Sequence, residues 1–162
     1  MKDWKDRPVE VRNLDNPAFC GVIIYLCVNE YQRKSNKNFP FPLVYLVLPL
    51  VLTTPIRANI SSRTNLVNWA QRYPELLINF GKRTKDLVEI TNEAVEFVMQ
   101  AGYLQLTSEG ELSCCKKLKG VNQEKNPDQE VKDCFDKAKH VARWFANTQR
   151  VETIYICLGV RP

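Results

Sequence analysis

The apolar positions in the first third of the chain predict two helices of different character. Apolar residues recur at helical spacing over Phe19–Tyr31, and the preceding Asn16-Pro17 suits a helix start, because Asn is a good N-cap and Pro fits the first turn. The segment Leu43–Leu52 is apolar almost all round and predicts a central helix that Pro49 kinks or ends. The two prolines of Phe39–Pro42 predict an extended connection between these helices.

The stretch that follows the central helix predicts short helices separated by loops. Ile56–Arg63 is predicted as a loop that carries two arginines. Thr64 or Asn65 suits the cap of a short helix that runs through Arg72. Gly81 is expected to break or bend the next helical region, since glycine is a poor helix former.

The middle of the chain predicts a helix followed by a β-hairpin. Thr91 can cap a helix with Ala94, Val95 and Val98 on its inner face, and Gly102 stands where a helix C′ glycine is expected. Alternating residues over 103–107 and 111–114 then predict two strands joined by a polar turn. This succession resembles the end of a winged-helix domain, in which the hairpin is the wing.

The last third predicts one long helix and a final strand. The stripe that predicts the helix is formed by Val131, Phe135, Ala138, Val141, Ala142 and Phe145. The β-branched, alternating stretch Val151–Val160 predicts a C-terminal strand. The fold class expected is therefore α+β: a mostly helical single domain over residues 16–162 with a winged-helix-like β-hairpin and a C-terminal strand. Residues 1–15 are expected to form an N-terminal arm, and residues 116–127 a mobile linker.

Length and composition favour one globular domain. The chain has 162 residues, of which 44% are hydrophobic and 25% charged, with a net charge of +5. That mild excess permits contact with nucleic acid or an acidic partner and proves neither. The longest apolar run, Pro42–Leu52, is far shorter than the roughly 20 residues that a membrane span needs, so no membrane association is expected.

The polar and sulfur-bearing residues predict no enzyme, metal site or cofactor. The six cysteines form no CxxC pair, and without a signal peptide they are expected to be reduced thiols in the cytoplasm. His140 is the only histidine, and it falls on the solvated side of a lysine-rich helix turn. No GxSxG or GxxxxGK[ST] motif occurs, so neither a nucleophile elbow nor a phosphate loop is indicated.

Nucleic-acid contact is a weaker expectation. The helix over 91–100 carries Glu93 and Glu96, which argues against base reading in the major groove. A soluble basic surface is favoured over a binding site, and the candidate phosphate contacts are Lys82, Arg83, Lys85, Lys116, Lys117 and Lys119.

Several short motifs carry a family resemblance over nearly the whole chain. They are Asn16-Pro17-Ala18-Phe19-Cys20, Leu48-Pro49-Leu50-Val51-Leu52, Lys137-Ala138, Arg143-Trp144-Phe145 and Leu158-Gly159-Val160-Arg161-Pro162. Together they resemble the middle component of bacterial three-component ABC-ATPase (Lamassu-like) anti-phage defence systems.

The resemblance implies an accessory subunit with protein partners. It would dock onto an SMC/Rad50-like ABC ATPase and help to assemble or restrain an effector, a nuclease, with non-specific DNA contact inside the complex as a further option. The partner-binding residues expected are Arg143, Trp144, Phe145 and Arg161, with either one aromatic ring in the core and the other on a partner, or both rings in the core. The alternative is a winged-helix DNA-binding transcription regulator.

Overall fold

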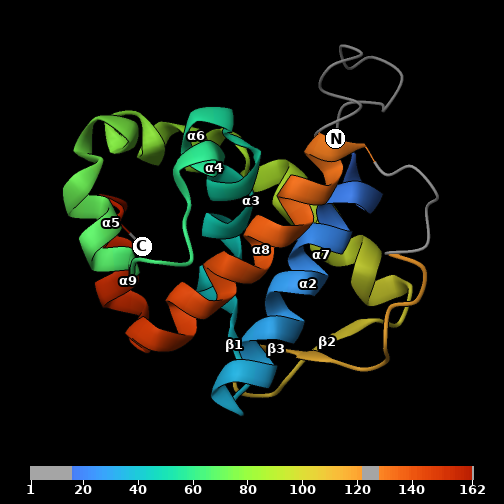
Figure 1. Cartoon of the computed structure of the whole chain (residues 1–162). Helices are drawn as coiled ribbons and strands as arrows, with labels where there is room; N and C mark the ends of the chain where they lie inside the picture. Colours follow the sequence, from blue (N-terminus) through green and yellow to red (C-terminus); the bar gives the residue numbers. More distant parts are fainter. Residues whose placement is uncertain (1–15, 122–127, 162) are drawn as a thin grey trace.

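Helices make up most of the structure, and three short strands form one antiparallel sheet (Figure 1). The computed structural model describes residues 16–121 and 128–161. In chain order the elements are α2 (Pro17–Ser35), β1 (Phe39–Pro40), η2 (Phe41–Leu43), α3 (Val44–Leu52), α4 (Thr54–Asn59), α5 (Leu66–Arg72), η3 (Pro74–Leu77), α6 (Phe80–Asp86), α7 (Val88–Gln100), β2 (Leu104–Leu106), β3 (Glu111–Cys114), α8 (Gln129–Thr148) and α9 (Val151–Cys157). The α+β fold class is confirmed.

The first helix, α2, lies in the middle of the molecule and packs against both α7 and α8 (Figure 1). The Asn16 side chain caps it, accepting hydrogen bonds from the backbone N–H groups of Ala18 at 2.8 Å and Phe19 at 3.4 Å. Its other end closes at Asn36, whose φ of 56° is left-handed. The start predicted at Asn16-Pro17 is confirmed.

The central apolar segment forms α3, as predicted, with Pro49 inside the helix. The predicted loop at 56–63 is wrong in its first half, because α4 follows α3 after a break at Thr53. Pro55 has no N–H to offer the carbonyl of Val51 one turn earlier. The Arg57 guanidinium takes that carbonyl instead, with Nη1 donating to Val51 O at 2.8 Å. An arginine thus completes the end of α3.

The hairpin is confirmed, and it acquires a third strand. Leu104 pairs with Cys114 and Leu106 with Leu112, while Phe39 in β1 pairs with the other edge of β3. The sheet order is therefore β1-β3-β2. The extended connection predicted around Phe39 has become the third strand.

Two helix boundaries differ from prediction. α7 begins at Val88 rather than at Thr91, and Thr91 is buried inside it with its hydroxyl donating to the carbonyl of Leu87. Gly81 lies within α6 and does not break it. Asn65 caps α5 as predicted, since its side chain accepts from the N–H of Asn68.

The predicted C-terminal strand is wrong: the segment forms the helix α9. Ile154, Tyr155 and Leu158 are all buried, and this spacing places them on one helical face. The Tyr155 hydroxyl also donates to the carbonyl of Pro42, which fixes that face against the core. Tertiary packing here outweighs the β-branched composition.

Part of the predicted linker is held in place. The Tyr25 hydroxyl of α2 donates to Lys116 O at 2.8 Å and accepts from the N–H of Leu118 at 3.2 Å. Residues 122–127 of that linker lie outside the described residues, as does the predicted arm over 1–15.

Candidate functional site

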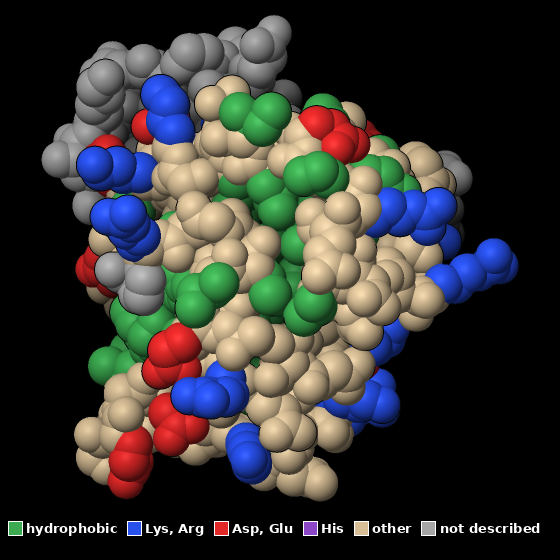
Figure 2. All heavy atoms as spheres, turned by 90° about the vertical axis from the view of Figure 1, so that its left-hand side faces the viewer, with side chains coloured by type: hydrophobic (Ala, Val, Ile, Leu, Met, Phe, Trp, Pro, Cys, Tyr) green, Lys and Arg blue, Asp and Glu red, His purple; other side chains and the backbone are tan. Residues whose placement is uncertain are grey.

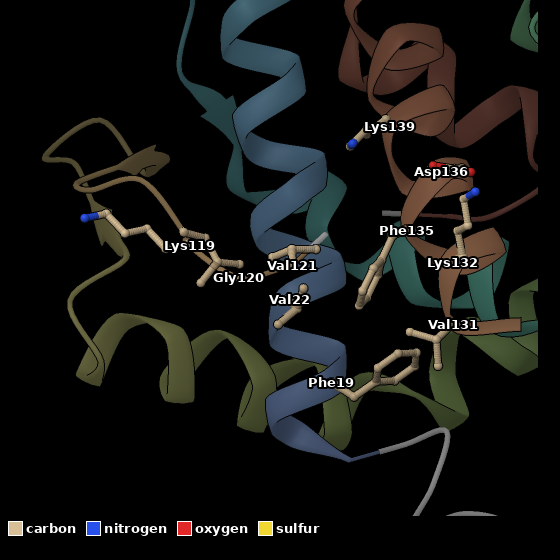
Figure 3. Close-up of a pocket in the computed structure, with 11 residues that line it drawn as sticks. Phe19, Val22, Lys119, Gly120, Val121, Val131, Lys132, Phe135, Asp136 and Lys139 are labelled. Carbon is tan, nitrogen blue, oxygen red and sulfur yellow. The ribbon is translucent and has the colours of Figure 1, made fainter. Parts of the chain in front are cut away.

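A groove lies where the first turns of α2 and α8 meet residues 118–121 (Figure 3). We call it the basic-rimmed groove. Its volume is about 690 Å³. It is lined by Phe19, Val22, Leu118, Lys119, Gly120, Val121, Val131, Lys132, Phe135, Asp136 and Lys139.

Helical spacing places the apolar floor of this groove. Phe19 and Val22 are three residues apart on α2, and Val131 and Phe135 are four apart on α8, so each pair lies on one helix face. The Phe19 and Phe135 rings approach to 5.7 Å between centroids, which closes one end of the floor. All four side chains are only partly buried, so they offer apolar surface to a ligand.

The rim of the groove is positively charged. Lys119, Lys132 and Lys139 contribute three ammonium groups, against one carboxylate from Asp136 (Figure 3). Among the described residues, no salt bridge engages any of these four side chains. The groove therefore combines an apolar floor with uncompensated positive charge.

A second surface lies on the far side of the molecule, over α5, α6 and α9. Figure 2 shows hydrophobic side chains gathered over the middle of this face. Ile78, between η3 and α6, is 77% exposed; Ile156 on α9 is 75% exposed, and Val67 on α5 is 36% exposed. We call these three residues the isoleucine face. Large apolar side chains left in water on one face are typical of a protein contact.

A polar cluster joins α2 to α8 and is fully engaged. Arg33 donates to both oxygens of the Glu30 carboxylate, and Arg143 Nε donates to Glu30 Oε1 at 3.0 Å. The hydrogen bonds from Arg33, and then Arg143, hold the pKa of Glu30 below its ordinary value despite burial. Burial, Arg143 and Lys137 lower the pKa of His140, which favours its neutral form. The cluster thus ties two helices together.

Burial suppresses the reactivity of three of the six cysteines. No disulfide joins the six cysteines, all of which lie in the described part of the chain. Burial raises the pKa of Cys27 far above its ordinary value, that of Cys114 to about 12 and that of Cys134 to about 11. These thiols stay protonated at neutral pH and are poor nucleophiles.

No cluster of three or more His, Cys, Asp or Glu side chains that could hold a metal ion occurs over residues 16–121 and 128–161. Within the same residues, no helix has both the length and the apolar character needed to cross a membrane.

A family model described as ABC-three component (ABC-3C) system Middle Component 3 matches residues 4–162. The chain belongs to this family. Comparison with curated proteins and with solved structures gives no match. The resemblance drawn from the short motifs to an ABC three-component middle component is therefore confirmed at the level of the family.

The structure places both aromatic rings predicted for partner binding in the core of this middle component. Trp144 is 3% exposed, packs on Trp69 at 5.2 Å, and donates from Nε1 to Thr64 O at 2.8 Å. Phe145 is fully buried beside Phe39. Consecutive residues can both be buried because this end of α8 lies between α2 and α5.

The two arginines predicted for partner binding have different settings. Arg143 is held by Glu30, and its Nη1 lies 3.4 Å from Nδ1 of His140. Arg161 is exposed and lines a smaller pocket of about 370 Å³ with Lys85 and Tyr155. Partner contact by Arg143, Trp144, Phe145 or Arg161 stays a prediction.

The candidate phosphate contacts of the middle component do not form one patch. Lys82, Arg83 and Lys85 lie on α6, and Lys116, Lys117 and Lys119 follow β3 on the opposite side of the molecule (Figure 1). Lys82 pairs with Asp86 at 2.8 Å, and the Lys116 ammonium lies 4.3 Å from the centroid of the Tyr103 ring. A single stretch of DNA would not meet both groups at once.

The isoleucine face and the basic-rimmed groove were both missed from the sequence. Val131 and Phe135 were assigned to the core stripe of the last helix, and Ile156 to a strand. A strand gives no reason to expose Ile156, whereas a helix turns it away from buried Ile154 and Tyr155. Lys132 and Lys139 lie within one helical turn of the apolar stripe that includes Val131 and Phe135. Their position could have indicated that this part of the stripe borders a charged surface.

Proposed function

We propose that this chain is a non-catalytic accessory subunit of a Lamassu-like defence complex in the cytoplasm. It docks onto an SMC/Rad50-like ABC ATPase and helps to assemble or restrain an effector nuclease. Membership of the middle-component family supports a role among protein partners. The further identity of those partners rests on the resemblance.

The observation that carries docking is the isoleucine face. Ile78 and Ile156 each keep about three quarters of their surface in water. Burying one large apolar side chain contributes about 1.5–3 kcal/mol, so a partner that covers both would gain a substantial part of its binding energy from them. We assign the ATPase to this face.

The chemistry of the titratable groups supports a non-catalytic role. Glu30 is neutralised by two arginines, His140 is held toward its neutral form beside Arg143, and the buried thiols stay protonated. Glu30 and His140, two groups that could act as a base, are therefore engaged in contacts between helices.

Co-expression with a candidate SMC/Rad50-like ATPase and effector tests the docking. A tagged chain should retain the ATPase on purification, and the double variant Ile78→Asp/Ile156→Asp should lose it. Leu106→Asp is the matched control, because Leu106 is 49% exposed on β2, away from the isoleucine face. Wild-type chain that elutes without the ATPase, or equal retention by both variants, would contradict the proposal.

The sheet supports a second candidate, a winged-helix regulator that binds DNA. The chain runs helix, strand, several helices and then hairpin, and β1 pairs with the last strand of that hairpin. However, the helix before the hairpin, α7, exposes Glu89, Glu96 and the apolar ring of Phe97, which would repel or fail to contact phosphates. A fluorescence anisotropy titration with labelled duplexes decides: sequence-preferring, salt-sensitive binding would favour this candidate.

A further inference from the structure

We propose that the basic-rimmed groove binds an acidic amphipathic helix of a partner subunit. The inference rests on the proposed accessory role, and it assigns a second contact surface that is separate from the isoleucine face. Its recognition follows a known mode, in which the apolar face of a helix lies in a groove between helices.

The floor of the groove fits the apolar face of such a helix. Phe19, Phe135 and Val131 form one end of the floor, and Val22 and Val121 continue it along the contact between α2 and residues 118–121 (Figure 3). A volume of about 690 Å³ accommodates several branched or aromatic side chains. A polar ligand would bury these rings and methyl groups without compensating contacts.

The rim selects the charge of the partner. Lys132 and Lys139 project from α8 on one side of the floor, and Lys119 lies on the other side with its side chain directed away from the floor (Figure 3). An apolar stripe flanked by Glu or Asp would place its carboxylates near these ammonium groups, whereas a lysine-flanked stripe would be repelled. Asp136 is the single opposing charge among the lining residues.

Two other occupants fit less well. A second copy of the chain would bring its own three rim lysines against these three. Residues 1–15 are charge-balanced, because Lys2, Lys5, Arg7 and Arg12 match Asp3, Asp6, Glu10 and Asp15. Neither supplies the net negative charge that the rim favours.

The position of the groove suits a subunit that stands between two partners. The groove is at the first turns of α8, and the helix leads away from it toward α5 and α9, which carry the isoleucine face (Figure 1). A helix of 20 residues is about 30 Å long, so the two surfaces are far enough apart to be occupied together.

Fluorescence anisotropy with the full chain and two designed peptides tests the proposal. Both peptides are helical, of about 18 residues, and share one Leu/Phe stripe. Glu and Asp flank the stripe in one peptide, and Lys flanks it in the other. We expect the acidic peptide to bind with a Kd at least about tenfold lower than the basic peptide, and to bind more weakly as salt rises.

Charge reversal locates the binding. Lys132→Glu/Lys139→Glu should raise the Kd of the acidic peptide at least about tenfold. Lys34→Glu/Lys37→Glu is the control, because it changes the net charge equally at exposed positions around the other end of α2. Circular dichroism confirms that both variants are folded.

Each other outcome overturns the proposal. These outcomes are no saturable binding of the acidic peptide, equal affinity for the two peptides, or an equal loss in the control variant. Binding only to a chain that lacks residues 1–15 would assign the groove to that segment, and competition with self-association in ultracentrifugation would assign it to a second copy. The assay contains no ATPase, so its failure is distinct from failure of the isoleucine-face experiment.

Discussion

Arg143 of α8 donates to the carboxylate of Glu30 on α2 at 3.0 Å, and so joins two helices whose residues lie 113 positions apart in the chain. Glu30 is 6% exposed and also accepts from Arg33. A buried carboxylate that loses one of its partners pays a desolvation cost, so this contact stabilises the packing of α2 against α8.

Arg143→Ala should therefore lower the free energy of unfolding by about 1–2 kcal/mol, measured by urea denaturation. Arg33→Ala is the matched control, because Arg33 is bound to the same carboxylate but is exposed and lies in the same helix. Its loss should be smaller, since it ties no second element to α2. Equal losses for the two variants would contradict the role assigned to Arg143.

Acidification should destabilise the fold in two stages. Burial, Arg143 and Lys137 lower the pKa of His140 from 6.5, so the unfolded chain binds this proton more readily and stability falls below about pH 6.5. The hydrogen bonds from Arg33 and Arg143 lower the pKa of Glu30 from 4.5, so its contribution is present above that pH and is lost as the pH falls through the lower folded value.

Urea midpoints recorded from about pH 8 down to about pH 2, below the lowered pKa of Glu30, measure both stages. His140→Asn should flatten the first stage and leave the second, because the carboxylate and its arginines are retained. An unchanged slope in the variant would show that another group titrates there.

Replacing the buried Arg57 should lower the free energy of unfolding more than most single substitutions. It is 4% exposed and donates to Val51 O, to Glu130 at 2.9 Å and to Asp133 at 3.1 Å. Arg57→Ala should lower the free energy of unfolding by about 2–3 kcal/mol, since the carbonyl and two carboxylates lose their donor. Arg57→Lys should recover only part of this, because an ammonium cannot meet three acceptors in one plane.

Urea denaturation of these two variants, with Lys82→Ala as an exposed ion-pair control, checks the estimate. Lys82→Ala should change stability by less than about 0.5 kcal/mol. A loss for Arg57→Ala no larger than that of the control would contradict the assignment.

Two glycines should respond in opposite directions to the same change. A Cβ at Gly21 would lie 2.7 Å from Val98 Cγ1 and 3.3 Å from Ala94 O, so Gly21→Ala should push α2 from α7 and cost about 1–3 kcal/mol. A Cβ at Gly81 would meet only Gly159 O at 3.9 Å, so Gly81→Ala should stabilise α6 by up to about 1 kcal/mol. Thermal unfolding of both variants measures the two signs, and a loss at both positions would contradict the packing.

The sequence was sufficient to predict an element where residues close together in the chain determine its local conformation. The Asn16 cap, the apolar segment that becomes α3, and the hairpin with left-handed Gly102 and Gly110 were all predictable, because each depends on neighbours in sequence. The family, too, was recognisable from short motifs.

Prediction failed where distant residues decide the outcome. α9 is helical because Ile154 and Tyr155 face the core, which the β-branched composition does not reveal. The sequence did not show which of Trp144 and Phe145 is buried, because the contacts of Trp144 with Trp69 and the carbonyl of Thr64 come from distant residues. Charged Arg57 was assigned to a loop because its three acceptors come from two other helices.

The partners of Arg57 also set an order of events during translation. Glu130 lies 73 residues after Arg57, and Asp133 lies 76 after it. The ribosome therefore completes α3 and α4 long before it makes the carboxylates that neutralise the guanidinium between them. Until α8 emerges, this corner holds an uncompensated cation, and α2 lacks one of its two flanking helices. This corner of the fold therefore cannot close until α8 has been synthesised.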